Sequence, residues 1–129
     1  MTVLVGYVPT AEGEAAFAAA LEEASRRSEP LLLLNSPRGG AAVSSDVADD
    51  AAVALMADRA REGGVALEVR QSPHSGEIAD EVLRVAQETD ASVIVIGMRK
   101  RSPVGKLLMG SSAQRILLDA DRPVLAVKP

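Results

Sequence analysis

Short apolar runs alternate along the chain with segments of helical periodicity. Val3 to Val8 is a first run that ends at Pro9, a residue that cannot continue a central strand. Leu31 to Leu34 is a second run, with a proline before it and another soon after it. The third run, from Ala91 to Ile96, is almost entirely apolar and is followed by Gly97. Continuous apolar runs are typical of parallel strands buried on both faces, and these three predict such strands.

Two further runs predict strands that are less buried. In Val65 to Val69 the apolar residues alternate with Ala66 and Glu68, so one face of this strand is expected to be partly wet. This alternation predicts a strand at an edge of the sheet. Pro123 introduces the last run, Val124 to Val127.

The segments between these runs predict four helices. We expect them from Thr10, as N-cap, to Arg27; from Asp46, as N-cap, to the stop at Gly63-Gly64; from Gly76 to Thr89; and from Ser111 to about Asp119. In the second helix, two stripes at four-residue spacing are expected to be buried: Val47, Ala51 and Leu55, and Ala48, Ala52 and Met56. Arg38 to Ser45 is expected to be the longest loop.

Five strands alternating with four helices predict an α/β fold. The expected architecture is an open five-stranded parallel sheet with helices on both faces and right-handed crossovers, Rossmann-like or flavodoxin-like. The pattern alone gives no strand order. The length of 129 residues and the 47% apolar composition predict one domain over residues 1–129.

Composition argues against several classes of protein. The net charge of -4 and the pI near 5.0 disfavour nucleic acid as a partner, as does an aromatic content of 2%, which is Tyr7 and Phe17 alone. The absence of cysteine excludes disulfides and thiolate metal sites. No apolar stretch approaches the ~20 residues of a membrane span, and no signal peptide is recognisable at Met1. A cytoplasmic protein with no membrane partner is expected.

The segment between Asp90 and Asp119 contains no carboxylate. It does contain five cations that follow the buried strand, namely Arg99, Lys100, Arg101, Lys106 and Arg115. Ligands of open α/β sheets bind at the carboxyl ends of the strands, so this pattern predicts an anion site there. Lys106 and Arg115 are interpreted as surface charges, and a solvated turn is the alternative for the other three.

Glycines and hydroxyls border the same segment. Gly110 would let the backbone approach a ligand, while Ser111 and Ser112 could cap the helix or bind a phosphate oxygen. The alternative is that Gly97 merely ends a strand and Gly110 merely precedes a helix.

Other candidate groups have simpler interpretations. His74 lies in a predicted loop without a second histidine or a cysteine to share a metal, so no metal site is expected. Asp46, Asp49 and Asp50 crowd a helix start, where the helix dipole favours them. Tyr7 could pack over a base or fill the edge of the core.

Two segments of the chain form a recognisable pattern, Val93 to Lys128, which ends in Arg-Pro-Val-Leu-Ala-Val-Lys, and the first strand from Val3 to Thr10. Through these segments the whole chain resembles the universal stress protein family. Nucleotide-binding members carry glycine, two residues, glycine, nine residues, then glycine followed by serine or threonine. Gly97, Lys100, Gly110 and Ser111 occupy these positions here. The chain departs from the pattern at Lys100, and at Val8, where the family usually has an acidic residue.

The resemblance implies an adenine nucleotide alpha hydrolase-like fold and a non-catalytic, nucleotide-binding homodimer that acts in the stress response. The ligand would be ATP, AMP or a cyclic nucleotide, with no metal required. The implied binding residues are Tyr7, Val8, Pro9, Gly97, Arg99, Lys100, Gly110, Ser111 and Ser112. Dimerisation would pair Val124 to Val127 with its own copy. The alternatives are a nucleotide-free structural dimer of the same family and a slow ATP hydrolase.

Overall fold

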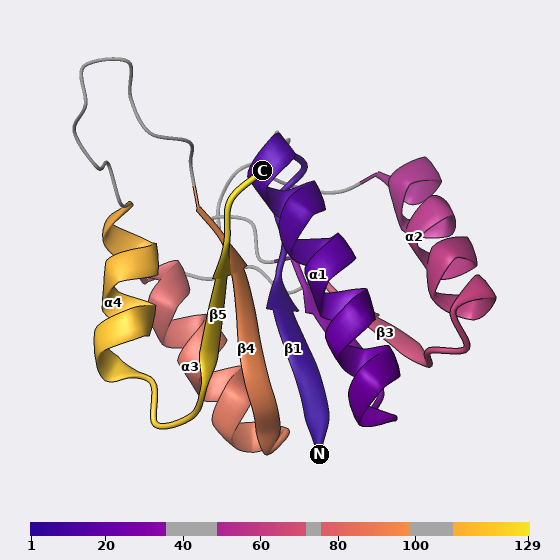
Figure 1. Cartoon of the computed structure of the whole chain (residues 1–129). Helices are drawn as coiled ribbons and strands as arrows, with labels where there is room; N and C mark the ends of the chain where they lie inside the picture. Colours follow the sequence, from indigo (N-terminus) through magenta and orange to yellow (C-terminus); the bar gives the residue numbers. More distant parts are fainter. Residues whose placement is uncertain (36–48, 72–75, 99–109) are drawn as a thin grey trace.

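Strands and helices alternate along the chain, as predicted (Figure 1). The computed structural model describes residues 1–35, 49–71, 76–98 and 110–129. Its strands are β1 (Thr2–Gly6), β2 (Leu31–Leu34), β3 (Leu67–Arg70), β4 (Ala91–Gly97) and β5 (Val124–Val127). Its helices are α1 (Ala11–Arg27), α2 (Asp50–Glu62), α3 (Ile78–Glu88) and α4 (Ser111–Asp119). The predicted loop from Arg38 to Ser45 lies outside the described residues.

The five strands form one parallel sheet in the order β3-β2-β1-β4-β5. This is the Rossmann order rather than the flavodoxin order. It places β3 at one edge, as the alternating pattern predicted, and β5 at the other. The chain moves outward from β1 through β2 to β3, then returns to β4 on the other side of β1. The direction of winding therefore changes between β1 and β4, and such a switch point is where open α/β sheets bind ligands.

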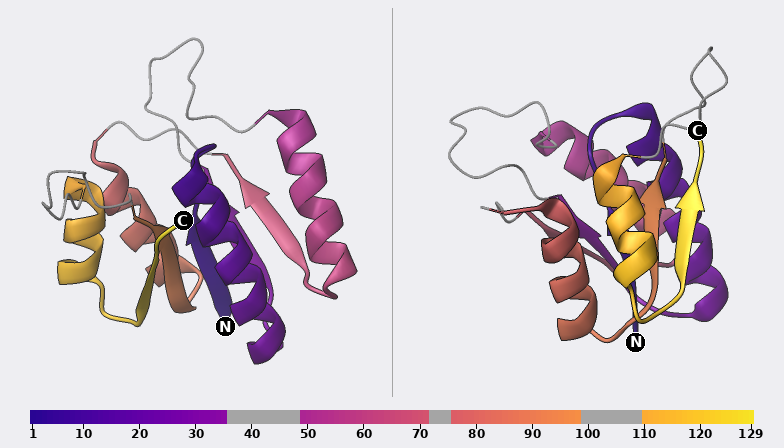
Figure 2. Two further views of the ribbon diagram at one scale, coloured as in Figure 1. Left: turned by 45° about the horizontal axis from the view of Figure 1, so that its top comes forward. Right: turned by 90° about the vertical axis from the view of Figure 1, so that its left-hand side faces the viewer.

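Two layers of helices cover the sheet (Figure 2). Helices α1 and α2 pack on one face, where Phe17 joins Val3 and Val5 in a fully buried cluster. Helices α3 and α4 pack on the other face, where Val85 lies against Leu4 and its neighbours. Successive strand residues point to opposite faces, so β1 contributes apolar side chains to both clusters. Burial on both faces of the sheet explains the continuous apolar runs in the sequence.

Helix α2 differs from the prediction in its N-cap and in the side chains that it buries. Its N-cap is Asp49, whose side chain accepts a hydrogen bond of 2.8 Å from the Ala52 amide, so the prediction of Asp46 as the cap was wrong. The predicted positions 46–48 lie outside the described residues. Leu55 is 66% exposed while Met56 is 2% exposed. The helix buries one of the two adjacent stripes, because a helix on an edge strand has one neighbouring surface to cover.

The first helix starts close to the sheet. Thr10 is the N-cap of α1, as predicted, and its hydroxyl accepts a hydrogen bond of 3.2 Å from the Gly13 amide. Strand β1 ends at Gly6, two residues before the end predicted at Val8. Residues 7–10 therefore form the connection between β1 and α1, at the carboxyl edge of the sheet.

Candidate functional site

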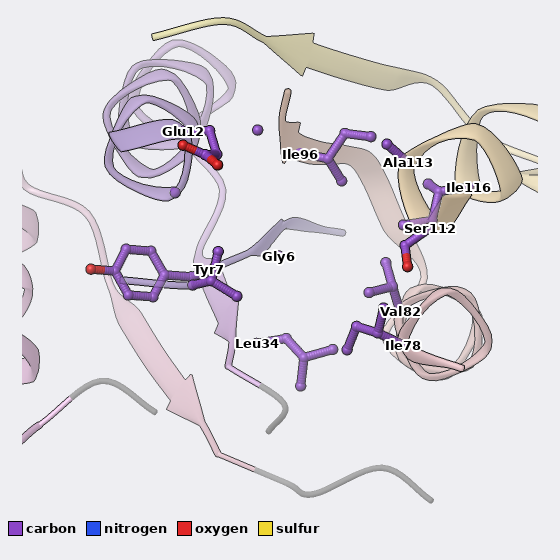
Figure 3. Close-up of a pocket in the computed structure, with 13 residues that line it drawn as sticks. Gly6, Tyr7, Glu12, Leu34, Ile78, Val82, Ile96, Ser112, Ala113 and Ile116 are labelled. Carbon is purple, nitrogen blue, oxygen red and sulfur yellow. The ribbon is translucent and has the colours of Figure 1, made fainter. Parts of the chain in front are cut away.

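A cavity of about 140 Å³ opens at the carboxyl edge of the sheet, where β1 and β4 lie side by side (Figure 3). Its lining comes from the ends of β1, β2 and β4 and from α1, α3 and α4. The lining residues are Gly6, Tyr7, Val8, Glu12, Gly13, Leu34, Ile78, Val82, Ile96, Gly97, Ser112, Ala113 and Ile116. The position agrees with the switch point of the sheet. The sequence predicted a site at this edge, and the structure shows a cavity there.

Two close backbone contacts hold the start of α1 against the ends of β1 and β4. A Cβ atom on Gly97 would overlap the carbonyl oxygen of Glu12 and lie 2.6 Å from its carbonyl carbon. A Cβ on Gly13 would overlap the carbonyl oxygen of Val8 in the same way and lie 2.9 Å from its carbonyl carbon. Only glycine permits such an approach. Gly97 therefore has a packing role at this site, whether or not a ligand also needs it.

Glu12 lies in the first turn of α1 and lines the cavity. Its side chain is half-buried, and no hydrogen bond or ion pair engages its carboxylate among the residues that the structure describes. The helix N-terminus favours a negative charge at this position. Glu12 was not predicted as a site residue, because the predicted site comprised the residues at the end of the first strand and those after β4. Its place just after β1 is the signal that could have identified it.

Tyr7 lines the cavity, but its side chain packs in the core. The side chain is 3% exposed, and its ring extends away from the other lining residues (Figure 3). Its hydroxyl donates a hydrogen bond of 2.7 Å to Glu14, whose other carboxylate oxygen lies 3.3 Å from Arg59. Burial and the hydrogen bond to Glu14 raise the pKa of Tyr7 to about 12. The phenol therefore stays neutral, and the ring anchors β1 against α1.

Asn35, directly after β2, fixes three strand ends and was not predicted as a site residue. It is fully buried, and its side-chain amide donates a hydrogen bond of 2.9 Å to the carbonyl of Tyr7. Its backbone amide donates a hydrogen bond of 2.9 Å to the carbonyl of Arg70 at the end of β3. A buried amide with satisfied hydrogen bonds makes this part of the carboxyl edge rigid.

The predicted site residues divide into three groups. Tyr7, Val8, Gly97 and Ser112 line the cavity. Pro9, Gly110 and Ser111 are exposed and lie outside the lining. Arg99 and Lys100, together with Arg101, Lys106 and His74, lie outside the described residues.

At the start of α4, the structure contradicts one of the two roles predicted for the hydroxyls of Ser111 and Ser112, that of a helix cap. Gly110 is the N-cap, and neither serine makes a capping hydrogen bond. Ser111 and Ser112 are the first two helical residues instead, so the prediction of a serine cap was wrong. Among the described residues, no side chain caps the first amides of α4.

Arg115 is a surface charge, as predicted. Its guanidinium pairs with Glu77 at 2.6 Å, Asp80 at 2.5 Å and Asp119 at 3.5 Å. These carboxylates raise the pKa of Arg115, with the hydrogen bond to Glu77 as the largest cause. An arginine shared by three carboxylates is not available to an anionic ligand, so the basic cluster predicted from the sequence does not include it.

Two further findings bear on the class of protein. Across the described ranges, no three histidine, cysteine, aspartate or glutamate residues are grouped so that they could hold a metal ion. None of the helices in these ranges has the length and apolar character needed to cross a membrane.

Comparison with known proteins agrees with the fold. Residues 1–128 match the family model described as the universal stress protein family. A universal stress protein of Mycolicibacterium smegmatis is 42% identical over 127 residues, which cover 98% of this chain and 97% of that protein. The structure of a universal stress protein from Archaeoglobus fulgidus aligns with a TM-score of 0.83 and 33% identity, covering 99% of this chain and 98% of the other.

A second structure from Archaeoglobus fulgidus is of a universal stress protein in complex with dAMP. It aligns with a TM-score of 0.73 and 24% identity over 99% of this chain and 98% of the other. These structural neighbours have the adenine nucleotide alpha hydrolase-like fold, which confirms the predicted fold class.

Proposed function

The chain belongs to the universal stress protein family, and we propose on that premise that it is a non-catalytic homodimer that binds an adenine nucleotide in the stress response. The observation that carries the proposal is the cavity between the ends of β1 and β4, because open α/β sheets bind nucleotides at this switch point. A protein of the same fold is known in complex with dAMP.

The cavity suits one part of a nucleotide. About 140 Å³ is below the roughly 300–1,000 Å³ of sites that enclose a whole small molecule. Its deep walls are apolar, with Leu34, Val82 and Ile116 all buried. The neutral adenosine portion therefore fits inside, and the phosphates remain outside it.

The phosphates would lie toward the start of α4. The first amides of α4, which no side chain of the described residues caps, and the helix dipole favour an anion, and Ser112 lines the cavity on this side. Gly97, Gly110 and Ser111 would keep their family positions in the proposed site, while Arg99 and Lys100 would add positive charge near the phosphates. Tyr7, Val8 and Pro9 would form the border at β1. ATP, AMP and a cyclic nucleotide all satisfy this chemistry.

A binding role is favoured over catalysis by the chemistry at hand. Phosphoryl transfer uses carboxylates to hold magnesium and to position the attacking nucleophile. Glu12 is the one carboxylate in the cavity lining as the structure describes it. ATP turnover at about 1 per second or faster, abolished by mutation of the site, would overturn the non-catalytic proposal.

Calorimetric titration of ATP, ADP, AMP and cyclic AMP at low salt tests nucleotide binding. We expect at least one of them to bind below millimolar concentration. Gly110→Asp should abolish that binding by placing a negative charge near the phosphates. No described heavy atom lies within 4 Å of a Cβ at this position, so the variant should fold. Gly110→Asn is the matched neutral control and should bind more tightly than Gly110→Asp.

A nucleotide-free dimer is the second candidate, and Val8 and Lys100 favour it because both depart from the family pattern. Absence of binding by all four nucleotides, together with a dimer in solution, would support it. Native mass spectrometry of freshly purified protein reports co-purified nucleotide and subunit number in one measurement.

Strand β5 supports the dimer proposal. The carbonyls of Pro123 and Val127 accept hydrogen bonds from the amides of Ile94, in β4, and Met98, just after β4. The backbone polar groups of Val124 and Ala126 therefore point to the opposite side of the strand. That side is an edge of the sheet. The apolar side chains of β5 already pack against α1 on one face and against the α3 and α4 layer on the other. We propose that the backbone edge pairs with its own copy, because an open strand edge is a template for such pairing.

A further inference from the structure

We propose that Glu12 recognises the ribose hydroxyls of the bound nucleotide by accepting hydrogen bonds from them, an inference that rests on the proposed function. Glu12 extends from the first turn of α1 to the cavity, and its carboxylate has no hydrogen-bond or ion-pair partner among the described residues. Within the part of the chain that the structure describes, this carboxylate is therefore available to a ligand. It is the strongest acceptor along the described lining of the cavity.

The lining explains why one carboxylate can control specificity. Apart from Tyr7, whose hydroxyl is occupied by Glu14, the polar side chains of the lining are Glu12 and Ser112. Figure 3 places them on opposite sides of the cavity, Glu12 on the side of α1 and Ser112 on the side of α4. The side chains between them are apolar, so the two polar groups set the orientation of a ligand.

The charge of Glu12 selects which end of a nucleotide approaches it. An ionised carboxylate accepts hydrogen bonds and donates none, so it requires donor groups on the ligand. It repels phosphates, which are drawn instead to the N-terminus of α4. The nucleoside end is therefore expected near α1.

Two donor groups of a nucleoside could meet the carboxylate, the ribose hydroxyls and the adenine amino group. Glu12 is half-buried next to the partly exposed Val8, whereas the apolar residues Val82 and Ile116 are buried in the wall. The flat base fits the apolar part, which leaves the ribose beside Glu12. The vicinal hydroxyls also present two donors to the two carboxylate oxygens, and acidic residues bind ribose hydroxyls in this way in Rossmann folds.

The position of Glu12 also compensates for the departure from the family pattern at Val8, just after β1. Val8 has no acceptor to offer, and its side chain is 37% exposed. Gly97 and Gly13 bring the first turn of α1 so close to the ends of β1 and β4 that Glu12 can serve the same cavity. A carboxylate on the helix thus takes the place of one on the strand.

Calorimetry with AMP, 2′-deoxy-AMP and 2′,3′-dideoxy-AMP tests the inference on the wild-type protein and on Glu12→Ala. We expect the wild type to bind AMP about tenfold or more tightly than the dideoxy compound, since hydrogen bonds to a charged group are strong. In Glu12→Ala the affinity for AMP should fall to about that for the dideoxy compound. Glu22→Ala, a change of the same charge at an exposed position of α1, should keep the wild-type ratio.

Three results would overturn the inference. The first is a wild-type protein that does not distinguish AMP from the dideoxy compound. The second is a Glu12→Ala variant that keeps the wild-type ratio of the two affinities, whether or not both affinities fall, because the residue would then not bind the hydroxyls. The third is that no adenine nucleotide binds the wild type. In that case the proposed function fails together with the inference, whereas the other results refute the inference alone. Thermal denaturation should show Glu12→Ala folded, because its carboxylate contributes no hydrogen bond among the described residues.

Discussion

Replacing Gly97 with alanine should destabilise the protein in the absence of any ligand. The new Cβ would overlap the carbonyl oxygen of Glu12, lie 2.6 Å from its carbonyl carbon and 3.1 Å from its Cβ. Carbon atoms in contact are normally about 3.5–4.0 Å apart, so the first of these distances is short by about 1 Å. The obstructing atoms belong to the backbone of α1 and cannot rotate away. The start of the helix must shift from the end of β4.

The magnitude follows from two opposing effects. Forcing an additional methyl group into a close-packed contact destabilises a protein by about 1–3 kcal/mol. Alanine also restricts the unfolded chain, which offsets about 0.4–1 kcal/mol of this loss. We expect a net decrease of about 1–2 kcal/mol in the free energy of unfolding, which lowers the melting temperature by roughly 4–8 °C for a chain of this size.

Urea unfolding followed by circular dichroism measures this difference, with Gly76→Ala as the matched control. No described heavy atom lies within 4 Å of a Cβ at Gly76, so this variant should be as stable as the wild type or slightly more stable. Equal stability of Gly97→Ala and the wild type, within about 0.3 kcal/mol, would refute the packing role of Gly97. The glycine would then matter for a ligand alone.

Three other measurements test separate features. Tyr7 is the one tyrosine of the chain and its pKa is raised to about 12, so an absorbance titration should show its phenolate forming near pH 12. The neutral phenol is favoured by folding, so its stabilising effect should be complete below about pH 10 and lost as the pH rises from 10 to 12, a loss absent from Tyr7→Phe. Met56→Ala should destabilise the protein by about 2–5 kcal/mol and Leu55→Ala by less than about 0.5 kcal/mol, and the reverse order would place the buried stripe of α2 on the side of Leu55. Ala126→Pro should yield a folded monomer in sedimentation equilibrium, and a dimer of unchanged stability would place the interface elsewhere.

The strands could be predicted from the sequence because local composition determines them. Ala91 to Gly97 and Leu31 to Leu34 have the predicted bounds, since strands buried on both faces require apolar residues throughout. The start of α2 could not be predicted in the same way. Several acidic residues precede an alanine-rich segment, so more than one N-cap and more than one buried stripe fit the pattern. Packing against the edge of the sheet selects Asp49 and Met56.

The sequence predicted at which edge of the sheet the candidate site lies, but it did not predict the full set of residues that line it. The sequence indicated the carboxyl ends of the strands and Gly97, because the family resemblance and the buried strand both point there. It did not indicate Asn35, Ile78 or Ile116, which reach the edge through the strand order and the packing of α3 and α4. Strand order is a tertiary property that no local pattern contains. The role of Gly97 in helix packing likewise depends on a neighbour 85 positions earlier in the chain, Glu12.

The start of α1 connects stability and recognition at this edge. Thr10 caps the helix, and the approach permitted by Gly13 and Gly97 sets its first turn against the ends of β1 and β4. The helix dipole stabilises a carboxylate in that turn by about 0.3–1 kcal/mol. A negative charge can therefore be held beside the cavity by the helix while the strand end carries Val8. Because the same two glycines also fix the helix in place, a change that loosens the packing should weaken recognition of the ribose together with stability. Gly97→Ala should accordingly reduce the preference for AMP over 2′,3′-dideoxy-AMP, even though neither glycine nor alanine has a polar side chain that could bind a hydroxyl.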